Sequence, residues 1–343
     1  MERYRQGDVD IAAAALSLDK KAVEHAQDDA FEKAETDLQG AKDLSGAMAI
    51  RRERIRLALA MALFHTDAAL HATGAAVDDQ IGLARGPVER LEPFAQDLQR
   101  AMQPVGRLTP DDIRDIVHQW YVVAALVLRQ MDRPTLDWLV SIAHERYPQD
   151  PIFSLLWGSA LERVAGGSVV DVSLVRDLYQ ADFVRRWRQT LSQAGRLYED
   201  ALDADPTATE ARVRLGRVSL LAGDRKKARA ALEQALKEAQ TKRLRYLAAL
   251  FLGAVADADE KPDEAANAYE HVWSIVPGAQ SAAFAMSRIA DAGGDTDAAR
   301  DWLDRTLAVP FKERDDPWET YYDVPEAGTL LDRMAVLREY LTR

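Results

Sequence analysis

Histidine as a residue type binds metals and takes part in acid–base chemistry near neutral pH, so the six histidines of the sequence are the first candidates for such roles. His65 and His71 are six residues apart, which does not place them on one helix face as a zinc-binding pair at i and i+4 would be. His144 precedes Glu145, but no second histidine follows four residues later. The absence of cysteine excludes disulfides, thiolate zinc sites and cysteine nucleophiles. The sequence therefore predicts no metal site.

Adjacent carboxylates are the next candidates, and they occur at Asp28-Asp29, Asp78-Asp79 and Asp315-Asp316. Neighbouring residues diverge on a helix, so paired-carboxylate catalysis would require convergence through the fold. We interpret these acids as solvated turn residues. The sequence has no Gly-rich phosphate loop, no Gly-x-Ser-x-Gly and no EF-hand loop. It therefore predicts no catalytic residues and no cofactor.

The charge balance argues against a nucleic-acid partner. The formal net charge is −12, whereas phosphate binding needs a basic stripe. Two short basic runs, 185–188 and 242–245, are interpreted as solvated helix faces rather than phosphate sites. The apolar run 57–64 is far shorter than the roughly 18–20 residues of a membrane span. The sequence therefore predicts no membrane span, and residues 57–64 are expected to form a buried helix.

Small residues recur along the chain with a spacing near 34. This is the length of one helix–turn–helix unit in a helical solenoid. The spacing predicts an all-α fold in which close helix pairs meet at small side chains. The series are Ala124 and Gly158, 34 apart; Gly216, Gly253 and Ser287, 37 and 34 apart; and Ala194, Ala228, Ala265 and Ala299, 34, 37 and 34 apart.

The turns of these units have a recognisable chemistry. Gly223 is expected to end a first helix in the left-handed conformation, and Asp224 to cap the second. Proline cannot continue a helix, so Pro206, Pro277 and Pro310 are expected just beyond helix ends.

The period is interrupted in one place. Gly158 and Gly216 are 58 residues apart rather than 34, so this unit carries about 24 extra residues, which we assign to an insertion near 166–187. Residues 1–16, with a turn at Gly7-Asp8, are interpreted as a half-repeat.

Residues 17–116 are helical in pattern but do not keep the period. Thr109 followed by Pro110 is a strong helix start, with acids that favour the helix dipole. The glycine-containing stretch 73–86 is predicted to be a loop or hinge. The predicted helices of this region span 20–43, 47–72, 86–103 and 110–131.

The pattern Leu215-Gly216, Ala228, Leu232 and Ala235, together with its copies through Pro277, resembles the tetratricopeptide repeat family. The resemblance covers residues 117–313, with Trp120 and Tyr269 where the family prefers aromatics and with Ser287 and Thr306 as departures. It implies a right-handed superhelical α-solenoid whose first helices line a concave groove. It also implies a non-enzymatic role in binding a peptide or partner helix.

Outward positions on the first helices define the expected partner-binding groove. It is apolar with scattered charges of both signs. Lys and Asn, which clamp a partner's terminal carboxylate in some family members, are replaced by Val213 and Arg217, so such a clamp is not expected. Arg217 and Arg288 meet either acidic partner side chains or Asp257 and Asp291 of the solenoid itself. The candidate residues are Leu155, Val213, Arg217, Leu220, Leu250, Phe284 and Arg288.

The C-terminal segment 314–343 is expected to cap the solenoid, because a solenoid must cover its last apolar face. Its aromatic residues Trp318, Tyr321 and Tyr322 serve either in this cap or as a contact site for a partner, since Trp and Tyr dominate interface hot spots. The tail also resembles those of extracytoplasmic bacterial repeat proteins. Together with the absence of cysteine, it favours a periplasmic location over a cytoplasmic one, although no signal-peptide pattern is present.

Three functions are compatible with this pattern. The first is an interaction scaffold that binds a peptide or helix of another bacterial protein in the groove. The second is a subunit of a larger assembly, membrane-associated or enzymatic, contacted through residues 17–116. The third is an enzyme or small-ligand binder, which would need a deep pocket with converging titratable groups. The oligomeric state is left open by the sequence.

Overall fold

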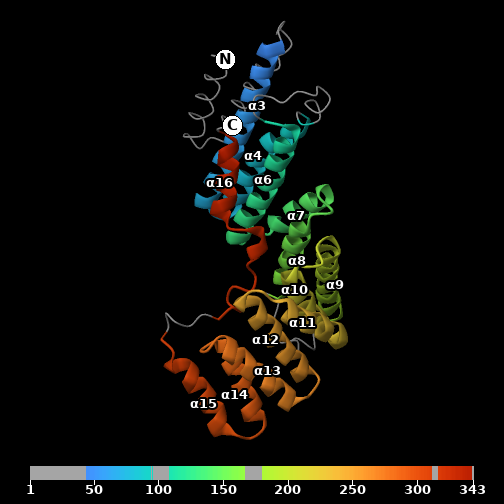
Figure 1. Ribbon diagram of the computed structural model, residues 1–343, viewed down its shortest axis with the longest axis vertical. Coiled ribbons are helices and arrows are strands. Elements are labelled where there is room, and N and C mark those ends of the chain that lie inside the picture. Colours follow the sequence, from blue (N-terminus) through green and yellow to red (C-terminus); the bar gives the residue numbers. More distant parts are fainter. Residues whose placement is uncertain (1–43, 94, 96–107, 167–179, 311–315, 342–343) are drawn as a thin grey trace. The chain divides into compact units, whose positions relative to one another are not determined.

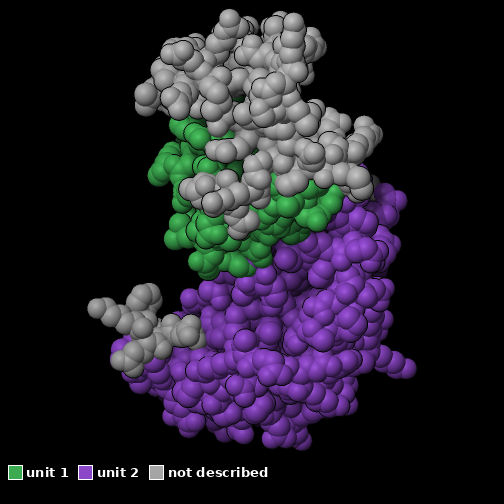
Figure 2. Space-filling view, turned by 45° about the horizontal axis from the view of Figure 1, so that its top comes forward, with its two compact units in different colours: residues 1–136, 328–343 green, residues 137–327 purple. Residues whose placement is uncertain are grey.

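The computed structural model describes residues 44–93, 95, 108–166, 180–310 and 316–341. All regular elements in these ranges are helices, in agreement with the predicted all-α class (Figure 1). The chain forms two compact units, which Figure 2 shows in different colours. Unit 1 comprises residues 1–136 and 328–343, and unit 2 comprises residues 137–327. The predicted half-repeat 1–16, the predicted helix 20–43 and most of the insertion 166–187 lie outside the described residues.

Unit 1 contains helices from both ends of the sequence. Helix α6 begins as predicted, because the Thr109 side chain accepts a hydrogen bond from Asp112 N and the Asp112 carboxylate accepts one from Thr109 N. Helix α16 packs on α3 and α6, and Tyr340 donates a 2.6 Å hydrogen bond to Asp115 Oδ2. Residues near the C-terminus therefore complete a unit that begins at the N-terminal end. Its helices are α3 (Leu44–His71), α4 (Ala75–Glu89), α6 (Pro110–Gln130) and α16 (Leu330–Tyr340).

The loop predicted at 73–86 is wrong. Only Gly74 has a positive φ, at 58°, and a helix runs from Ala75 to Glu89 through Gly82 and Gly86. Burial of an apolar face against α3 outweighs the cost of glycine in a helix, which is about 1 kcal/mol for each residue. The buried residues on this face include Val77, Ile81, Ala84 and Val88.

Asp78 in α4 also differs from the solvated turn acid that the sequence suggested. Its carboxylate lies 2.5 Å from Arg133 Nη2 and 3.0 Å from Arg133 Nε, and it accepts a further hydrogen bond from the Thr135 hydroxyl. The acid therefore ties α4 to the segment that follows α6, a contact between residues 55 to 57 positions apart in sequence.

Unit 2 consists of helix pairs in chain order. Within each pair the helices pack together, and the second helix of each pair contacts the first helix of the next. The first helices α8 and α12 both contact α10, so these three form one layer. The helices are α7 (Thr135–Arg146), which begins at the boundary with unit 1, α8 (Pro151–Gly166), α9 (Gln180–Ala204), α10 (Thr209–Ala222), α11 (Arg225–Glu238), α12 (Lys242–Ala258), α13 (Pro262–Ile275), α14 (Gln280–Ala292) and α15 (Thr296–Ala308), followed by the short 3₁₀ helix η2 (Pro325–Ala327).

The predicted turn between α10 and α11 is confirmed. Gly223 adopts a left-handed conformation with φ 91°, which permits the chain to leave α10. Asp224 then accepts a 3.0 Å hydrogen bond from Lys227 N and caps α11. Pro277 and Pro310 likewise follow the ends of α13 and α15. Local sequence chemistry therefore sets the helix ends of the repeats.

The small-residue series marks the closest approach of paired helices. A Cβ on Gly253 in α12 would lie 2.5 Å from Tyr269 Cε1 of α13, and one on Gly158 in α8 would lie 2.6 Å from Tyr198 Cε1 of α9. A side chain at either position would push the paired helices apart.

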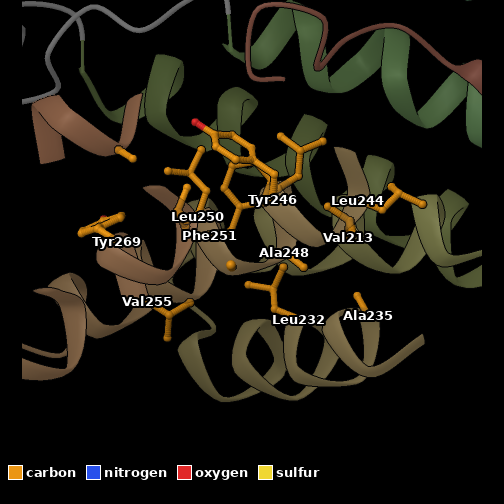
Figure 3. Close-up of a cluster of buried hydrophobic side chains, with 14 of the residues drawn as sticks. Val213, Leu232, Ala235, Leu244, Tyr246, Ala248, Leu250, Phe251, Val255 and Tyr269 are labelled. Atoms are coloured by element: carbon orange, nitrogen blue, oxygen red, sulfur yellow. The ribbon is translucent and has the colours of Figure 1, made fainter. Parts of the chain in front are cut away.

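An apolar core of unit 2 extends from α10 to α14, and Figure 3 shows part of it. Val213, Tyr246 and Val255 are fully buried there. Tyr321, from the segment after α15, belongs to the same core. The C-terminal part of unit 2 therefore shares the core of the repeats.

Candidate functional site

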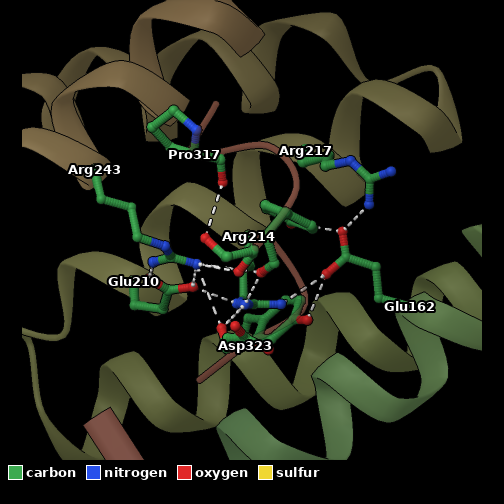
Figure 4. A network of polar contacts seen from close by, with 10 residues as sticks. Glu162, Glu210, Arg214, Arg217, Arg243, Pro317 and Asp323 are labelled. Carbon is green, nitrogen blue, oxygen red and sulfur yellow. Dashed lines mark hydrogen bonds and ion pairs between the residues drawn. The ribbon is translucent and has the colours of Figure 1, made fainter. Parts of the chain in front are cut away.

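Residues 316–327, hereafter the strap, lie on the first helices of unit 2. The Tyr321 hydroxyl donates a 2.7 Å hydrogen bond to Glu162 Oε1 of α8. Arg214 of α10 donates to Tyr321 O, and Arg243 of α12 donates to Thr320 O at 3.2 Å. One short segment therefore contacts α8, α10 and α12 (Figure 4). The surface of these three helices under the strap is hereafter the first-helix face.

Asp316 anchors the start of the strap. Its carboxylate accepts hydrogen bonds from the Tyr246 hydroxyl at 2.9 Å and from Ser281 N at 2.8 Å. It also accepts one from Trp318 N at 3.0 Å, which stabilises the turn of the strap itself. The side chain is buried, so the prediction of a solvated turn acid is wrong here. The sequence could not show this, because Tyr246 and Ser281 lie 70 and 35 positions away.

Five charged side chains form an ion network beneath the strap (Figure 4). Glu162 Oε1 lies 2.5 Å from Arg217 Nη1, and Glu210 lies 2.7 Å from Arg214 Nε and 2.5 Å from Arg243 Nη1. The side chains of Glu162, Glu210 and Arg214 are completely buried. Charges at such depth persist only when they are paired, and each of these five lies against an opposite charge. Arg214 Nη1 and Arg243 Nε make no hydrogen bond.

The arginines of the network also bind the main chain of the strap. Arg214 Nη2 donates to Tyr321 O at 2.5 Å and to Asp323 O at 2.7 Å. Arg243 Nη2 lies 3.2 Å from Thr320 O and 3.3 Å from Tyr321 O. The solvated face predicted at 242–245 is therefore wrong for Arg243, whose side chain is only 19% exposed. Both guanidinium groups hold the turns of the strap through carbonyl oxygens that every residue type supplies.

Two tyrosine hydroxyls complete the hydrogen bonds of Glu162. Tyr198 donates to Oε2 and Tyr321 to Oε1, each at 2.7 Å. Burial raises the pKa of both phenols well above 10, and the negative charge of Glu162 raises it further. Burial alone would lower the pKa of Arg214, but the charge of Glu210 holds it above its ordinary value. The phenols therefore remain protonated donors and the guanidinium remains charged.

An aromatic cluster holds the side chains of the strap. The Arg217 guanidinium carbon lies 4.6 Å from the ring centroid of Tyr321 and 4.8 Å from that of Trp318. These two rings stack on one another with centroids 5.1 Å apart. Phe251 of α12 meets both edge-on. Such cation–π contacts are worth about 2 kcal/mol when the cation is desolvated, so Arg217 holds the strap by its rings as well as by charge.

Comparison with known proteins gives a match over most of the helix pairs of unit 2. The family model described as tetratricopeptide repeat matches residues 189–250 and 258–315, which extend from α9 to the segment after α15. The predicted resemblance to the tetratricopeptide repeat family is therefore confirmed for these residues. Proteins with this fold are generally interaction scaffolds rather than enzymes. The agreement of the matched residues with the helix pairs confirms the predicted family and fold class.

Solved structures of other repeat proteins resemble the chain in fold alone. The crystal structure of MamA is 20% identical, with a TM-score of 0.39, over 50% of this chain and 85% of MamA. A thermophilic tetratricopeptide repeat protein of Thermus thermophilus, TTC0263, is 19% identical, with a TM-score of 0.36, over 66% and 96% of the two chains. The human IFIT1 dimer with PPP-AAAA is 14% identical, with a TM-score of 0.40, over 84% and 69%. A search of curated proteins gives no match.

The groove residues predicted from the repeat pattern differ in how far they are buried. Leu155, Val213 and Leu250 are buried, and Leu220 is partly buried. Phe284 and Arg288 on α14 are exposed. Arg288 pairs with Asp257, as one sequence interpretation held, whereas Arg217 pairs with Glu162 instead.

The aromatic residues predicted in the C-terminal segment meet one another on the first-helix face. Tyr321 is fully buried, while Trp318 and Tyr322 are partly buried. The Tyr321 and Tyr322 rings pack edge to face with centroids 5.2 Å apart. All three rings lie within 6 Å of the Arg217 guanidinium.

Sequence reasoning missed Glu210, Arg214 and Arg243 as members of the site. A signal was present in part: Glu210 and Arg214 are four positions apart and so share a helix face, and Arg217 lies three positions further. Their burial carried no signal in the sequence, because it depends on contacts with a strap that lies 77 to 109 positions away in the chain.

A hollow in unit 2 has a volume of about 690 Å³ and lies among α7, α8 and α9. It is open to solvent and is lined by His144 and Trp157 together with acids of α9. Among the described residues no group of three His, Cys, Asp or Glu side chains could hold a metal ion. Nor does any described helix have the length and apolarity needed to cross a membrane.

Proposed function

We propose that this protein is a non-enzymatic scaffold that holds a peptide segment of another protein on the first-helix face of unit 2. The observation that supports the proposal is the strap, since the face already holds a polypeptide segment, which is built of consecutive turns and the 3₁₀ helix η2. Arg214 and Arg243 donate hydrogen bonds to its main-chain carbonyl oxygens, and Arg217 makes cation–π contacts with its aromatic rings. Main-chain contacts provide affinity for any sequence, and side-chain contacts add specificity.

The proposed binding surface continues onto α14. Phe284 is 56% exposed and Arg288 has an exposed side chain, so both are accessible to a partner while the strap is in place. Arg288 lies against Asp257 of α12, which makes α14 the next first helix of the series. In this proposal the buried Leu155, Val213 and Leu250, with partly buried Leu220, form the floor of the groove, and Phe284 and Arg288 form its open end.

Partner capture with matched variants tests the proposed function. The double variant Phe284→Glu, Arg288→Glu replaces an apolar and a basic side chain at the open end with acids. Its affinity for a captured partner should therefore fall at least about tenfold, or by roughly 1.4 kcal/mol. Leu307→Glu on α15 is the control, because Leu307 is also exposed, at 66%, but lies on a second helix. Both proteins would be immobilised, and bound proteins from the native cell quantified by mass spectrometry. Equal capture by both variants would contradict the proposal for this surface.

A further inference from the structure

We propose that the strap is a resident ligand of the first-helix face, which competes with partner segments and must leave before one can bind under Arg214, Arg217 and Arg243. This inference rests on the proposed function and adds a regulatory step to it. It also specifies the partner chemistry as a turn-forming segment that carries two aromatic rings, one of them a tyrosine.

The ion network does not depend on the strap. Its four ion pairs join Glu162 of α8, Glu210, Arg214 and Arg217 of α10, and Arg243 of α12, and none involves a strap side chain. When the strap leaves, these groups keep their opposite charges as partners and gain water. No buried charge is stranded, so the empty face retains the arrangement that a partner segment would need.

The strap contributes groups that another polypeptide can supply. They are the carbonyl oxygens of residues 320, 321 and 323, the Tyr321 hydroxyl and the rings over Arg217. Two aromatic side chains and a main chain that forms the same turns reproduce all of them. The face is therefore selective for a type of segment and not for this segment alone.

The strap is held along one side only. Tyr321, Val324 and Ala327 are buried at intervals of three residues. Glu319, which precedes them, and Asp323, which lies between the first two, are exposed. A segment anchored by a few side chains and open to water on its outer side can be exchanged without unfolding the helices beneath it.

Covalent attachment gives the strap its advantage over a free segment. Residues of α15 precede it and residues of α16 follow it in the same chain. A tethered segment competes at an effective concentration on the order of millimolar. A partner must therefore bind tightly, or first weaken the binding of the strap. Segments of low affinity do not displace a strap that is tethered in this way.

A synthetic peptide of residues 316–327 with a fluorescent label tests the proposal against the full-length chain. The double variant Trp318→Ala, Tyr321→Ala weakens the resident strap and should bind the peptide with one-to-one stoichiometry in fluorescence anisotropy. The wild-type chain should bind the same peptide about 100-fold more weakly or worse, because its own strap occupies the face. Equal affinity for wild type and variant would overturn the proposal.

The matched control is a variant of the peptide. A peptide with the same two alanine substitutions should not bind the variant chain, since it lacks the rings that meet Arg217 and Phe251. Circular dichroism verifies that the variant is folded. If the folded variant binds neither peptide, or both equally, the face does not recognise the strap sequence and the proposal fails. If the double variant does not fold, Trp318→Ala alone serves, and it should still bind the peptide more tightly than wild type.

Light scattering of the wild-type chain completes the test. A monomer agrees with a strap bound within its own chain, whereas a dimer that exchanges straps between copies would overturn the proposed competition. The peptide assay needs no partner, so its failure leaves the capture experiment with Phe284 and Arg288 intact. Conversely, capture can fail while the strap still proves to be a displaceable ligand.

Discussion

Glu162 shows how a single buried charge organises the first-helix face. It accepts hydrogen bonds from two tyrosines and an arginine that come from α9, α10 and the strap. Buried ion pairs contribute little net stability compared with well-packed apolar residues, but removing one partner is costly. The value of Glu162 therefore lies in fixing which groups meet at this point.

Substitution of Glu162 tests this role. Glu162→Gln leaves Arg217 with no full negative charge beside it, and we expect the free energy of unfolding of unit 2 to fall by about 3–5 kcal/mol. Asp301→Ala removes an exposed i,i+4 pair with Arg305 and should cost less than about 0.5 kcal/mol. Urea denaturation of both variants measures the difference. Similar losses in the two variants would contradict the central position of Glu162.

His65 gives unit 1 a dependence on pH. The side chain is 2% exposed and its Nδ1 lies 2.8 Å from Gln80 Oε1. Burial lowers the pKa below 6.5, and the hydrogen bond with Gln80 opposes this only in part. Above pH 6.5 the ring is neutral in the folded and unfolded chains. As the pH falls below 6.5, the unfolded chain takes up a proton before the folded chain does, so stability decreases until the folded pKa is passed.

We expect the thermal unfolding temperature of the wild-type chain to decrease from pH 7.5 to pH 5.5. His65→Gln should reduce this decrease, because the titrating group is gone. His271→Gln, at an exposed position of α13, should retain the wild-type dependence. Circular dichroism at several pH values measures all three proteins, and an undiminished dependence in His65→Gln would assign it to other groups.

At the scale of the elements, glycine positions set the distance between paired helices. Gly253 faces the Tyr269 ring, whereas Gly195 in α9 has its nearest neighbour, Val218 Cγ2, at 3.7 Å from an added Cβ. The two glycines occur in similar helices but differ in the space around them. Their substitutions should therefore differ in sign.

Gly253→Ala should destabilise unit 2 by about 1–3 kcal/mol, because the new methyl group overlaps the Tyr269 ring. Gly195→Ala meets only ordinary contacts and should be neutral or stabilising by up to about 1 kcal/mol through helix propensity. Chemical denaturation of both variants provides the measurement. A loss of stability in Gly195→Ala as large as in Gly253→Ala would refute the role of close helix approach.

At the scale of the whole molecule, the chain returns to the unit in which it began. Met334, Leu337 and Tyr340 of α16 are buried in unit 1, although more than 200 positions separate α16 from α6. Contacts of such sequence separation form late in folding, because loop closure must precede them. Unit 1 is therefore complete only when the last helix is present.

Removal of residues 328–343 should destabilise unit 1 selectively. Burial of each large apolar side chain contributes roughly 1.5–3 kcal/mol, so the loss of α16 should increase hydrogen exchange in α3 and α6. Exchange in α12 and α13, which belong to unit 2, should remain unchanged. Hydrogen exchange with mass spectrometry separates these peptides. Equal protection of α3 and α6 in the truncated and full chains would show that α16 is dispensable.

The sequence by itself determined the repeat period, the family and the helix ends of the repeats. These features depend on local chemistry: Gly223 permits a left-handed turn, Asp224 caps the next helix and Gly253 makes room for an aromatic ring. Each signal requires only residues close in sequence or one repeat apart.

Only the tertiary structure decided where the strap lies and which charges it covers. Arg214 and Tyr321 are 107 positions apart, and no periodicity relates them. The same limit explains why α4 was predicted as a loop, since its helix depends on burial against α3. Burial also converted Asp316 and Arg243 from apparent surface charges into anchors of the strap. Spacing encodes local backbone geometry, whereas burial depends on the whole fold, and burial decided which residues form the candidate site.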